Sequence, residues 1–310
     1  MREPKIKTNN TPHVPVLLEE TLEYLAPKQG ESYLDLTAGY GGHASAVLMR
    51  TEVPERTVLV DRDQMAISTL TQKFRVEGVE ILKSDFYTAS QKLIAQGRTF
   101  DLILADLGIS SPHIDIASRG FAFMQEGPLD MRMDQEQSLS ADTIVNTYSQ
   151  ADLAELLVKY GEEPRAKRIA ELIVNNRPLH TTTELAQVVA KAYPGHSKMH
   201  PATKTFQGLR IAVNDELELL KQSLPLWFAL LTPGGRLAVI SFHSLEDRIV
   251  KDMFKEAAGD RYDTDLRVLT KRPITAGHNE LVFNPRARSA KLRAVAKIKT
   301  KEREAHANSG

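Results

Sequence analysis

One stretch decides how this chain folds: residues 35–43 read DLTAGYGGH. A short apolar segment, Tyr33–Leu36, leads into it, and apolar residues at helical spacing follow over about 42–50. Glycines let a backbone turn tightly and approach a ligand closely. The stretch therefore predicts a strand, a glycine turn at Gly39, Gly41 and Gly42, and the start of a helix.

Outward from this turn, strand-like and helical segments alternate. Helical patterns lie near 64–75 and 88–96, between strand-like segments. Strands joined by helices form a parallel sheet with right-handed crossovers, so the fold class is α/β. The expected strands are Tyr33–Leu36, Thr57–Val60, Val79–Leu82, Phe100–Ala105, Gly235–Phe242 after a Pro-Gly-Gly turn, Arg267–Leu269 and Leu292–Ala296.

The alternation breaks in the middle of the chain. Residues 140–222 show only helical patterns, with start signals at Ser140 and at the capping-box pair Thr181 and Glu184. We therefore expect a helical insertion domain for substrate recognition inside an α/β core. The expected parts are a disordered 1–12, a core of 13–113 and 217–302, the insertion 114–216 and a frayed 303–310.

Composition excludes several functions. The 310 residues contain no cysteine, which excludes disulfides, thiolate metal sites and a cysteine nucleophile. Lys and Arg equal Asp and Glu at 40 each, so an argument for nucleic-acid binding must rest on local patches. No apolar run approaches the roughly 20 residues of a membrane span, and we expect a cytoplasmic protein. No spacing of acidic residues or histidines indicates a metal site.

The glycine turn fits two cofactors. Gly39, Gly41 and Ala44 match the dinucleotide fingerprint, and Asp61 ends the next strand, where a carboxylate can bind ribose hydroxyls. An NAD-dependent oxidoreductase is therefore one candidate, although the sequence offers no convincing hydride-transfer site.

Two further features favour S-adenosylmethionine. Asp35, inside the first strand, can orient the amino-acid end of that ligand. The pair Asp85 and Phe86 follows the third strand and can hold an adenine by a hydrogen bond and ring stacking.

Two segments are candidates for chemistry. Residues 106–113, DLGISSPH, follow the fourth strand, where ligands of parallel sheets bind. The Asp106 carboxylate and the turn carbonyls can accept the hydrogens of a planar amine and orient it for methyl transfer. In residues 241–248, SFHSLEDR, Ser244 and Asp247 have capping-box spacing. His243 beside them is either a proton acceptor or a structural histidine.

Together these motifs resemble the MraW family of bacterial ribosomal small-subunit methyltransferases. The resemblance is carried by residues 13–18, 41–43, 106–112, 119–124, 127–134, 200–207, 241–248 and 284–289. It implies a seven-stranded class I methyltransferase core with a helical insertion. It also implies N4 methylation of a cytosine in the decoding centre of 16S rRNA, on the assembled small subunit, and a homodimer.

The resemblance also implies site residues. Cofactor contacts fall on Gly41, Gly42, His43, Asp61, Phe86, Asp106 and His113. The family often has glutamine where this chain has His113, whose reach and pH behaviour differ. Ser110 and Pro112 belong to the same expected catalytic loop. The absence of cysteine agrees with direct transfer to N4, because cytosine C5 methylation normally needs a thiolate.

Two segments are candidates for contacting rRNA. Residues 284–303 hold eight Lys and Arg, among them Arg286, Arg288, Lys291 and Arg293, against one acid. The 119–134 loop carries Arg119, Phe121 and Arg132, and could form a lid with an aromatic ring for stacking. The alternative is that its apolar residues only pack the insertion onto the core. A non-catalytic RNA-binding or assembly factor is the remaining alternative function.

Overall fold

A seven-stranded sheet forms the core of the protein. In this computed structural model, the described residues are 15–75, 78–108, 116–195, 200–259 and 265–298. The strand order is β3-β2-β1-β4-β5-β7-β6. Strands β3 to β5 run parallel, and β7 is antiparallel to β5 and β6, so the expected α/β fold is confirmed. The strands are β1 Tyr33–Asp35, β2 Thr57–Asp61, β3 Glu80–Lys83, β4 Phe100–Asp106, β5 Leu231–Ser241, β6 Leu266–Val268 and β7 Lys291–Lys297.

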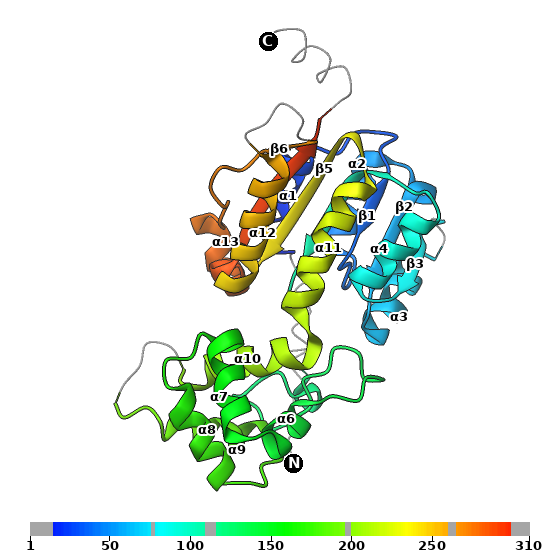
Figure 1. The fold of residues 1–310 in the computed structure, drawn as a ribbon. Coiled ribbons are helices and arrows are strands. Elements are labelled where there is room, and N and C mark those ends of the chain that lie inside the picture. The colour runs from blue at the N-terminus through cyan, green and yellow to red at the C-terminus, as the bar shows by residue number, and fades with distance from the viewer. Residues whose placement is uncertain (1–14, 76–77, 109–115, 196–199, 260–264, 299–310) are drawn as a thin grey trace.

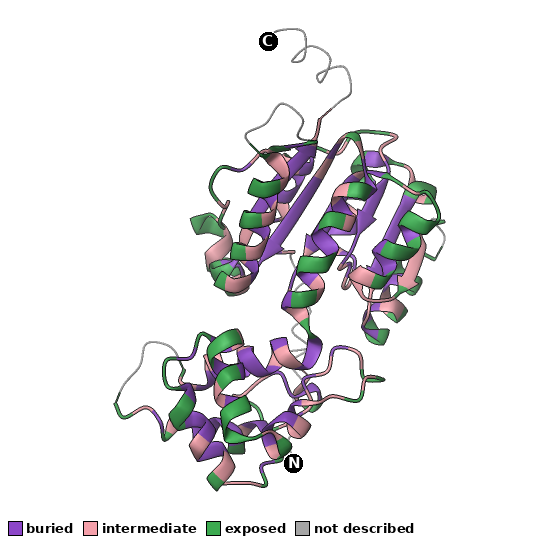
Figure 2. Cartoon of the chain, viewed as in Figure 1, coloured by how far each residue is buried: buried purple, intermediate pink, exposed green. Residues whose placement is uncertain are grey.

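The strands are buried because helices cover both faces of the sheet (Figures 1 and 2). Successive side chains of a strand point to opposite faces, so Tyr33 joins one apolar cluster and Leu34 the other. The second cluster contains Trp227, the single tryptophan. The helices of the core are α1 Leu18–Leu25, α2 Gly42–Thr51, α3 Gln64–Lys73, α4 Phe86–Ala95, α11 Glu216–Leu230, α12 Ser244–Ala258 and α13 His278–Phe283, with 3-10 turns η1 Pro54–Arg56 and η3 Pro285–Ser289.

One expected strand boundary is wrong. The Pro-Gly-Gly segment was expected as a turn ahead of the fifth strand, but β5 begins earlier, at Leu231. The pairing of β5 with β4 is irregular here, and Gly234 adopts a φ of 86°. The glycine therefore lies in an irregular part of β5, between Leu231 and Arg236, which both pair with β4.

The insertion forms a separate helical lobe between β4 and β5 (Figure 1). Its own apolar core includes Leu157, Ile169 and Leu209, all fully buried. The expected helix starts at Ser140 and Thr181 are confirmed, because both side chains accept a hydrogen bond from a backbone N–H of the first turn. The helices of the insertion are α6 Ala141–Thr147, α7 Gln150–Gly161, α8 Ala166–Asn175, α9 Thr182–Ala190 and α10 Ala202–Asn214, with the 3-10 turn η2 Ala117–Arg119.

The insertion returns to the core through one residue. Asp215, with a φ of 50°, separates α10 from α11, which packs on α4 in the core. The segments expected to be disordered or frayed, 1–12 and 303–310, lie outside the described residues. Within the part of the chain that is described, no helix combines the length and apolar character that crossing a membrane requires.

Candidate functional site

A cavity of about 610 Å³ opens at the carboxyl ends of the parallel strands. This is the edge where α/β sheets bind ligands. The cavity brings together these residues expected from the sequence: Gly39, Gly42, His43, Asp61, Asp85, Phe86 and Asp106. Pro15 and Arg286 approach from other parts of the core, and Met133 and Arg210 from the insertion.

The glycine turn is fixed by the carboxylate that ends β2. Gly39 donates its N–H to Oδ2 of Asp61 at 2.8 Å, and Asp63 donates its N–H to Oδ1 of the same carboxylate at 2.8 Å. Gly41 adopts a φ of 70° and does not line the cavity; a Cβ there would lie 2.7 Å from the ring of Phe74. Gly41 therefore serves the turn and its packing on α3, whereas Gly39 and Gly42 face the cavity.

Asp35 lies beneath the turn and does not line the cavity, contrary to expectation. Its carboxylate is 1% exposed and accepts hydrogen bonds from the Tyr33 hydroxyl at 2.8 Å and the Thr37 N–H at 3.2 Å. Burial raises the pKa of Asp35 to about 6, while His43 and these hydrogen bonds oppose the rise. Asp35 thus supports the backbone under the turn instead of facing a ligand.

One member of the expected adenine-binding pair, Asp85, is already used as a helix cap. Asp85 caps α4, and its two oxygens accept hydrogen bonds from the N–H and the hydroxyl of Thr88, each at 2.8 Å. Phe86 packs edge-on against the buried Trp227, with ring centroids 5.6 Å apart. This contact fixes the Phe86 ring beside the cavity, so the aromatic member of the pair is the better placed for stacking.

His43 and Asp106 leave polar atoms unpaired at the cavity. His43 is 7% exposed, and its Nε2 lies 3.6 Å from Oδ2 of Asp106. Neither ring nitrogen of His43 nor Oδ1 of Asp106 has a hydrogen-bond partner within the described residues. Leaving such atoms buried without a partner is costly, so their occurrence together on a cavity wall points to a polar ligand.

Little of the expected catalytic loop is described. The N–H of Asp106 donates to the Thr37 hydroxyl at 2.6 Å, which ties the end of β4 to the glycine turn. Gly108 follows with a φ of 102°. Ser110, Pro112 and His113 lie outside the described residues.

His243 caps a helix, so the capping pair expected at Ser244 and Asp247 is wrong. The box is one residue earlier: Nδ1 of His243 accepts the N–H of Glu246, and the Glu246 side chain accepts the N–H of His243. Nδ1 of His243 therefore has a structural role as a helix cap, which is one of the two roles expected for this histidine. Asp247 instead binds Arg293 and Lys291 on β7.

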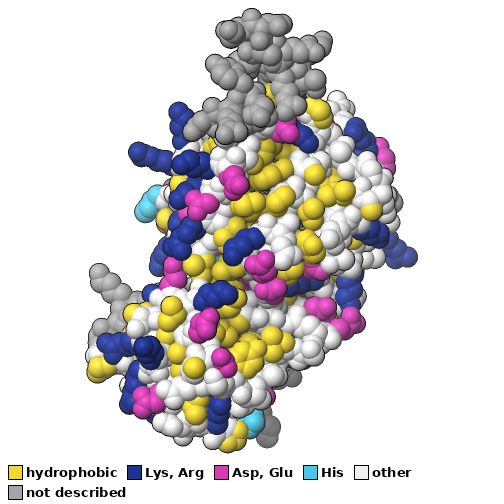
Figure 3. Space-filling model, in the orientation of Figure 1, with side chains coloured by type: hydrophobic (Ala, Val, Ile, Leu, Met, Phe, Trp, Pro, Cys, Tyr) yellow, Lys and Arg dark blue, Asp and Glu magenta, His cyan; other side chains and the backbone are white. Residues whose placement is uncertain are grey.

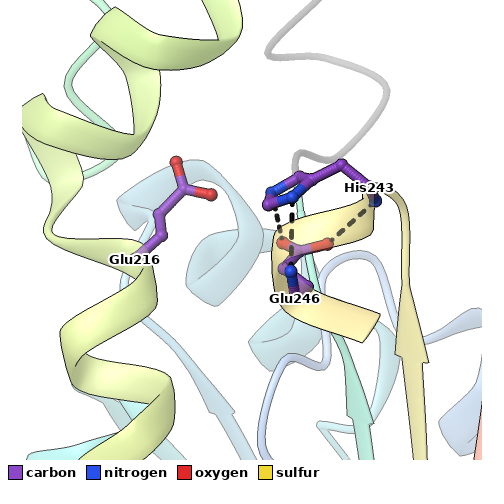
Figure 4. A group of neighbouring side chains, drawn as sticks. All are labelled: Glu216, His243 and Glu246. Atoms are coloured by element: carbon purple, nitrogen blue, oxygen red, sulfur yellow. Dashed lines mark hydrogen bonds and ion pairs between the residues drawn. The ribbon is translucent and has the colours of Figure 1, made fainter. Parts of the chain in front are cut away.

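Glu216 and Glu246, which the sequence did not indicate, line the cavity and lie close to His243 (Figure 4). Glu216, His243 and Glu246 bring metal-ligating atoms within 4.8 Å of one another. Arg210 already donates to both oxygens of Glu216, at 2.9 and 2.8 Å, and Glu246 accepts the Phe242 N–H at 2.8 Å. Burial opposes the charge of Glu246, but His243 and Arg210 lower its pKa below the usual range. These bonds stabilise the carboxylates without a metal.

Two expected rRNA contacts in the 119–134 loop are wrong. Arg119 is 5% exposed and donates to Oδ2 of Asp63 at 2.7 Å and to the carbonyls of Arg132 and Met133. Phe121 is buried in the core of the insertion. These two residues therefore lie in the protein interior: Arg119 ties the insertion to the core, as the alternative expected of the loop, and Phe121 packs inside the insertion, whereas Met124 of the same loop is exposed.

Most of the described basic segment is also paired within the protein. Arg293 is 6% exposed and binds Asp247 at 2.6 Å, and Lys291 binds the same carboxylate at 3.3 Å. In the 119–134 loop, Arg132 is likewise paired, because its guanidinium donates to both oxygens of Asp130. Of the expected rRNA contacts, Arg288 is exposed and Arg286 lines the cavity.

Comparison with known proteins shows the family of the chain. Residues 10–298 match the model of the MraW methylase family. The chain belongs to the MraW methylase family. Proteins named ribosomal RNA small subunit methyltransferase H are similar to it. The one from Synechocystis sp. is 47% identical over 295 residues, covering 92% of this chain and 93% of the relative. The one from Nitratidesulfovibrio vulgaris strain DP4 is 46% identical over 310 residues, covering 92% and 95%.

Among solved structures, an rRNA methylase from Streptococcus thermophilus gives a TM-score of 0.40 at 10% identity, covering 91% of this chain and 94% of that one. Membership in the MraW methylase family confirms the expected family. It also confirms S-adenosylmethionine as the cofactor, because the family is one of S-adenosylmethionine-dependent methyltransferases. The dinucleotide alternative is thereby set aside.

The sequence missed the cavity residues that this MraW methylase supplies from outside its cofactor motifs. Arg62 is half-buried, and its guanidinium contacts Met133 and the Asn214 carbonyl of the insertion. Arg210 and Glu216 flank the junction between the insertion and the core. No local pattern marks these residues, because only the docking of the insertion brings them to the cavity.

Proposed function

We propose that the chain transfers the methyl group of S-adenosylmethionine to the exocyclic N4 of a cytosine in the decoding centre of 16S rRNA, on the assembled small subunit. One observation carries the proposal. Asp106 ends β4 at the cavity, a quarter of its side chain is exposed, and its Oδ1 accepts no hydrogen bond within the described residues. A carboxylate oxygen in this position is ready to accept a hydrogen from an amine.

The cavity fits S-adenosylmethionine. Asp61 can bind the ribose hydroxyls, Phe86 can stack on the adenine, and the backbone of Gly39 and Gly42 lets a ligand approach closely. The unpaired nitrogens of His43 offer a further polar contact. When bound, S-adenosylmethionine supplies an electrophilic methyl group on its sulfonium sulfur.

For this reaction the protein must orient the amine of the cytosine and take up the proton that it releases. The exocyclic amine of cytosine is a weak nucleophile because its lone pair is delocalised into the ring. Asp106 would accept one amine hydrogen, hold the nitrogen in line with the methyl group and take up the proton that leaves after transfer. A C5 methyltransferase would need a cysteine thiolate, which the sequence does not contain.

The substrate assignment is supported by relatives at 46% and 47% identity that are named for methylation of small-subunit rRNA. The target atom, its place in the decoding centre and the preference for the assembled subunit follow from the resemblance described above. The homodimer and the cytoplasmic location stay predictions.

The proposal is tested by the variant Asp106→Asn, which keeps the side-chain size and removes the charge. We expect methyl transfer to fall by about 100-fold or more, as for removal of one oriented catalytic group. Asp252→Asn is the control, because Asp252 is exposed on α12, and it should keep normal turnover. Near-normal turnover of Asp106→Asn, with both variants binding S-adenosylhomocysteine, would refute the assignment.

The substrate is tested with small subunits from cells that lack the gene. Incubation with the protein and S-adenosylmethionine, followed by mass spectrometry of the 16S rRNA, should reveal one N4-methylcytidine. Calorimetry should show binding of S-adenosylhomocysteine and none of NADH. Methylation at C5, or an unchanged methylcytidine content, would overturn the proposed substrate. Cofactor binding without any transfer would favour the assembly-factor alternative.

A further inference from the structure

A solvent-exposed aromatic ring lies close in the chain to residues that line the cavity. Helix α13 ends in Val282 and Phe283, which are 61% and 86% exposed. Among the strongly exposed large apolar side chains of the described residues, Phe283 is the only aromatic one; the others are Met49, Met65, Ile94, Met124, Val158 and Val282. A ring left this open to water has its flat faces available for stacking.

The ring is close to the cavity along the chain. The 3-10 turn η3 follows α13, and its residues Arg286 and Ser289 line the cavity. Only Asn284 and Pro285 separate Phe283 from Arg286, so three peptide units join them and their Cα atoms are at most about 11 Å apart. This ring is therefore within reach of the neighbouring nucleotides of an RNA strand that places one base in the cavity.

The surroundings of the ring are basic. Arg288 is exposed on η3, and Lys271 and Arg272 are exposed on the segment that precedes Ile274. A bridge between Ile274 and Leu292 brings that segment to the η3 end of β7. Figure 3 shows Lys and Arg side chains gathered along the edge of the core that carries α12, β6 and α13.

These three cations are available to a ligand. Within the described residues, no ion pair or hydrogen bond occupies the side chains of Lys271, Arg272 or Arg288, whereas Lys291 and Arg293 are held by Asp247. The acid on the same helix, Glu280, is engaged by the N–H of Leu17. The surface thus presents three cations that no carboxylate of the described residues pairs with, around one apolar ring.

We propose that this surface, formed by Lys271, Arg272, Phe283 and Arg288 and here called the α13 surface, binds the rRNA nucleotides that adjoin the target cytosine. The base of one flanking nucleotide stacks on Phe283, and the cations bind the phosphates of that part of the RNA strand. Aromatic rings interleaved with cations are the usual means of binding unpaired RNA. The inference rests on the proposed function, since it takes the cavity as the place of the target base.

Charge and area favour RNA over a protein partner. A protein interface needs a wide apolar centre, but only Val282 and Phe283 are apolar and exposed here. The ring expected from the sequence to stack on rRNA, Phe121, is buried, so Phe283 takes that place.

The test measures the dissociation constant for small subunits from cells that lack the gene, with S-adenosylhomocysteine present. Phe283→Ala should weaken binding by about 5- to 150-fold, the range for loss of one stacked base. Phe283→Trp should restore it, and Met124→Ala, which removes another strongly exposed apolar side chain (74% exposed) from the 119–134 loop, should not change it. All three variants should bind S-adenosylhomocysteine normally.

Salt dependence tests the cations. Replacing Lys271, Arg272 and Arg288 with methionine should reduce the slope of log affinity against log salt by about 2, because each phosphate contact on a single strand contributes about 0.7. A photoreactive phenylalanine analogue at position 283 should crosslink to 16S rRNA.

Equal affinity of Phe283→Ala and the unaltered protein, or a crosslink only to a ribosomal protein, would overturn the α13 surface. In either case methylation at N4 by the unaltered protein would leave the proposed function standing. Conversely, loss of binding in Phe283→Ala without N4 methylation by the unaltered protein would support the surface and refute the reaction.

Discussion

Replacing Arg119 with methionine is expected to destabilise the protein instead of weakening its contact with rRNA. Arg119 and Asp63 form an ion pair at 2.7 Å, and each side chain is 6% exposed. The guanidinium also donates to the carbonyls of Arg132 and Met133, at 3.1 and 3.0 Å. Methionine fills similar volume but makes none of these bonds, so the buried Asp63 carboxylate loses the cation that balances its charge, although it still accepts the N–H of Met65, and two carbonyls lose a donor.

The size of the effect follows from burial. Removing one partner of a buried ion pair costs about 3–5 kcal/mol, because the other charge stays buried and uncompensated. Native proteins have a free energy of unfolding of only about 5–15 kcal/mol, so Arg119→Met should remove a large part of that stability. Adding Asp63→Asn should recover part of the loss, since it removes the uncompensated charge.

Urea unfolding followed by far-ultraviolet circular dichroism measures this difference. Arg288→Met is the matched control, because Arg288 is exposed and its loss should change stability by less than about 0.5 kcal/mol. If Arg119→Met unfolds like the unaltered protein while its affinity for small subunits falls, then Arg119 contacts rRNA after all and the reasoning from burial fails.

Two further predictions concern backbone and charge. Gly120→Ala should cost more than about 3 kcal/mol, because its φ is 73° and a Cβ would lie 2.1 Å from the Pro128 carbonyl oxygen. Gly30→Ala, with a φ of 84° and open space, should cost only about 1–2 kcal/mol; equal melting temperatures of the two variants would contradict this. Asp35 has a folded pKa of about 6, raised from 3.8 by burial. Its contribution to stability is therefore present below pH 3.8 and is lost as the pH rises to about 6. The difference in free energy of unfolding between Asp35→Asn and the unaltered protein should therefore change by about 2 kcal/mol in favour of the variant when the pH is raised from 4.5 to 7.5. A difference that does not depend on pH would be evidence against the buried charge.

Much of the core could be predicted because its causes are local. Strands that are buried on both faces read as short apolar runs, and residues such as Asp61 and Asp106 follow those runs directly. Since the carboxyl ends of parallel strands share one edge, sequence order alone places these acids on the same side of the sheet. The turn at Gly39 was recognisable for the same reason: the required conformation selects glycine at that position.

The exposure of charged and aromatic residues was not predictable in this way. Arg119 and Arg288 are the same residue type in polar segments, yet one is buried on Asp63 and the other is open to solvent. Phe121 and Phe283 differ likewise. A partner that is distant in sequence decides each case, and no local pattern encodes that partner.

The sequence by itself determined the α/β core, the helical insertion and the cofactor turn, because periodicity and turn chemistry act over a few residues. Only the tertiary structure decided which side chains face the cavity. It removed Asp35 from the cavity wall and assigned His243 to a helix cap. It also brought Arg210 from the insertion against Glu216 at the cavity. Those outcomes depend on how two separately folded lobes pack together, and burial and pairing are properties of that packing.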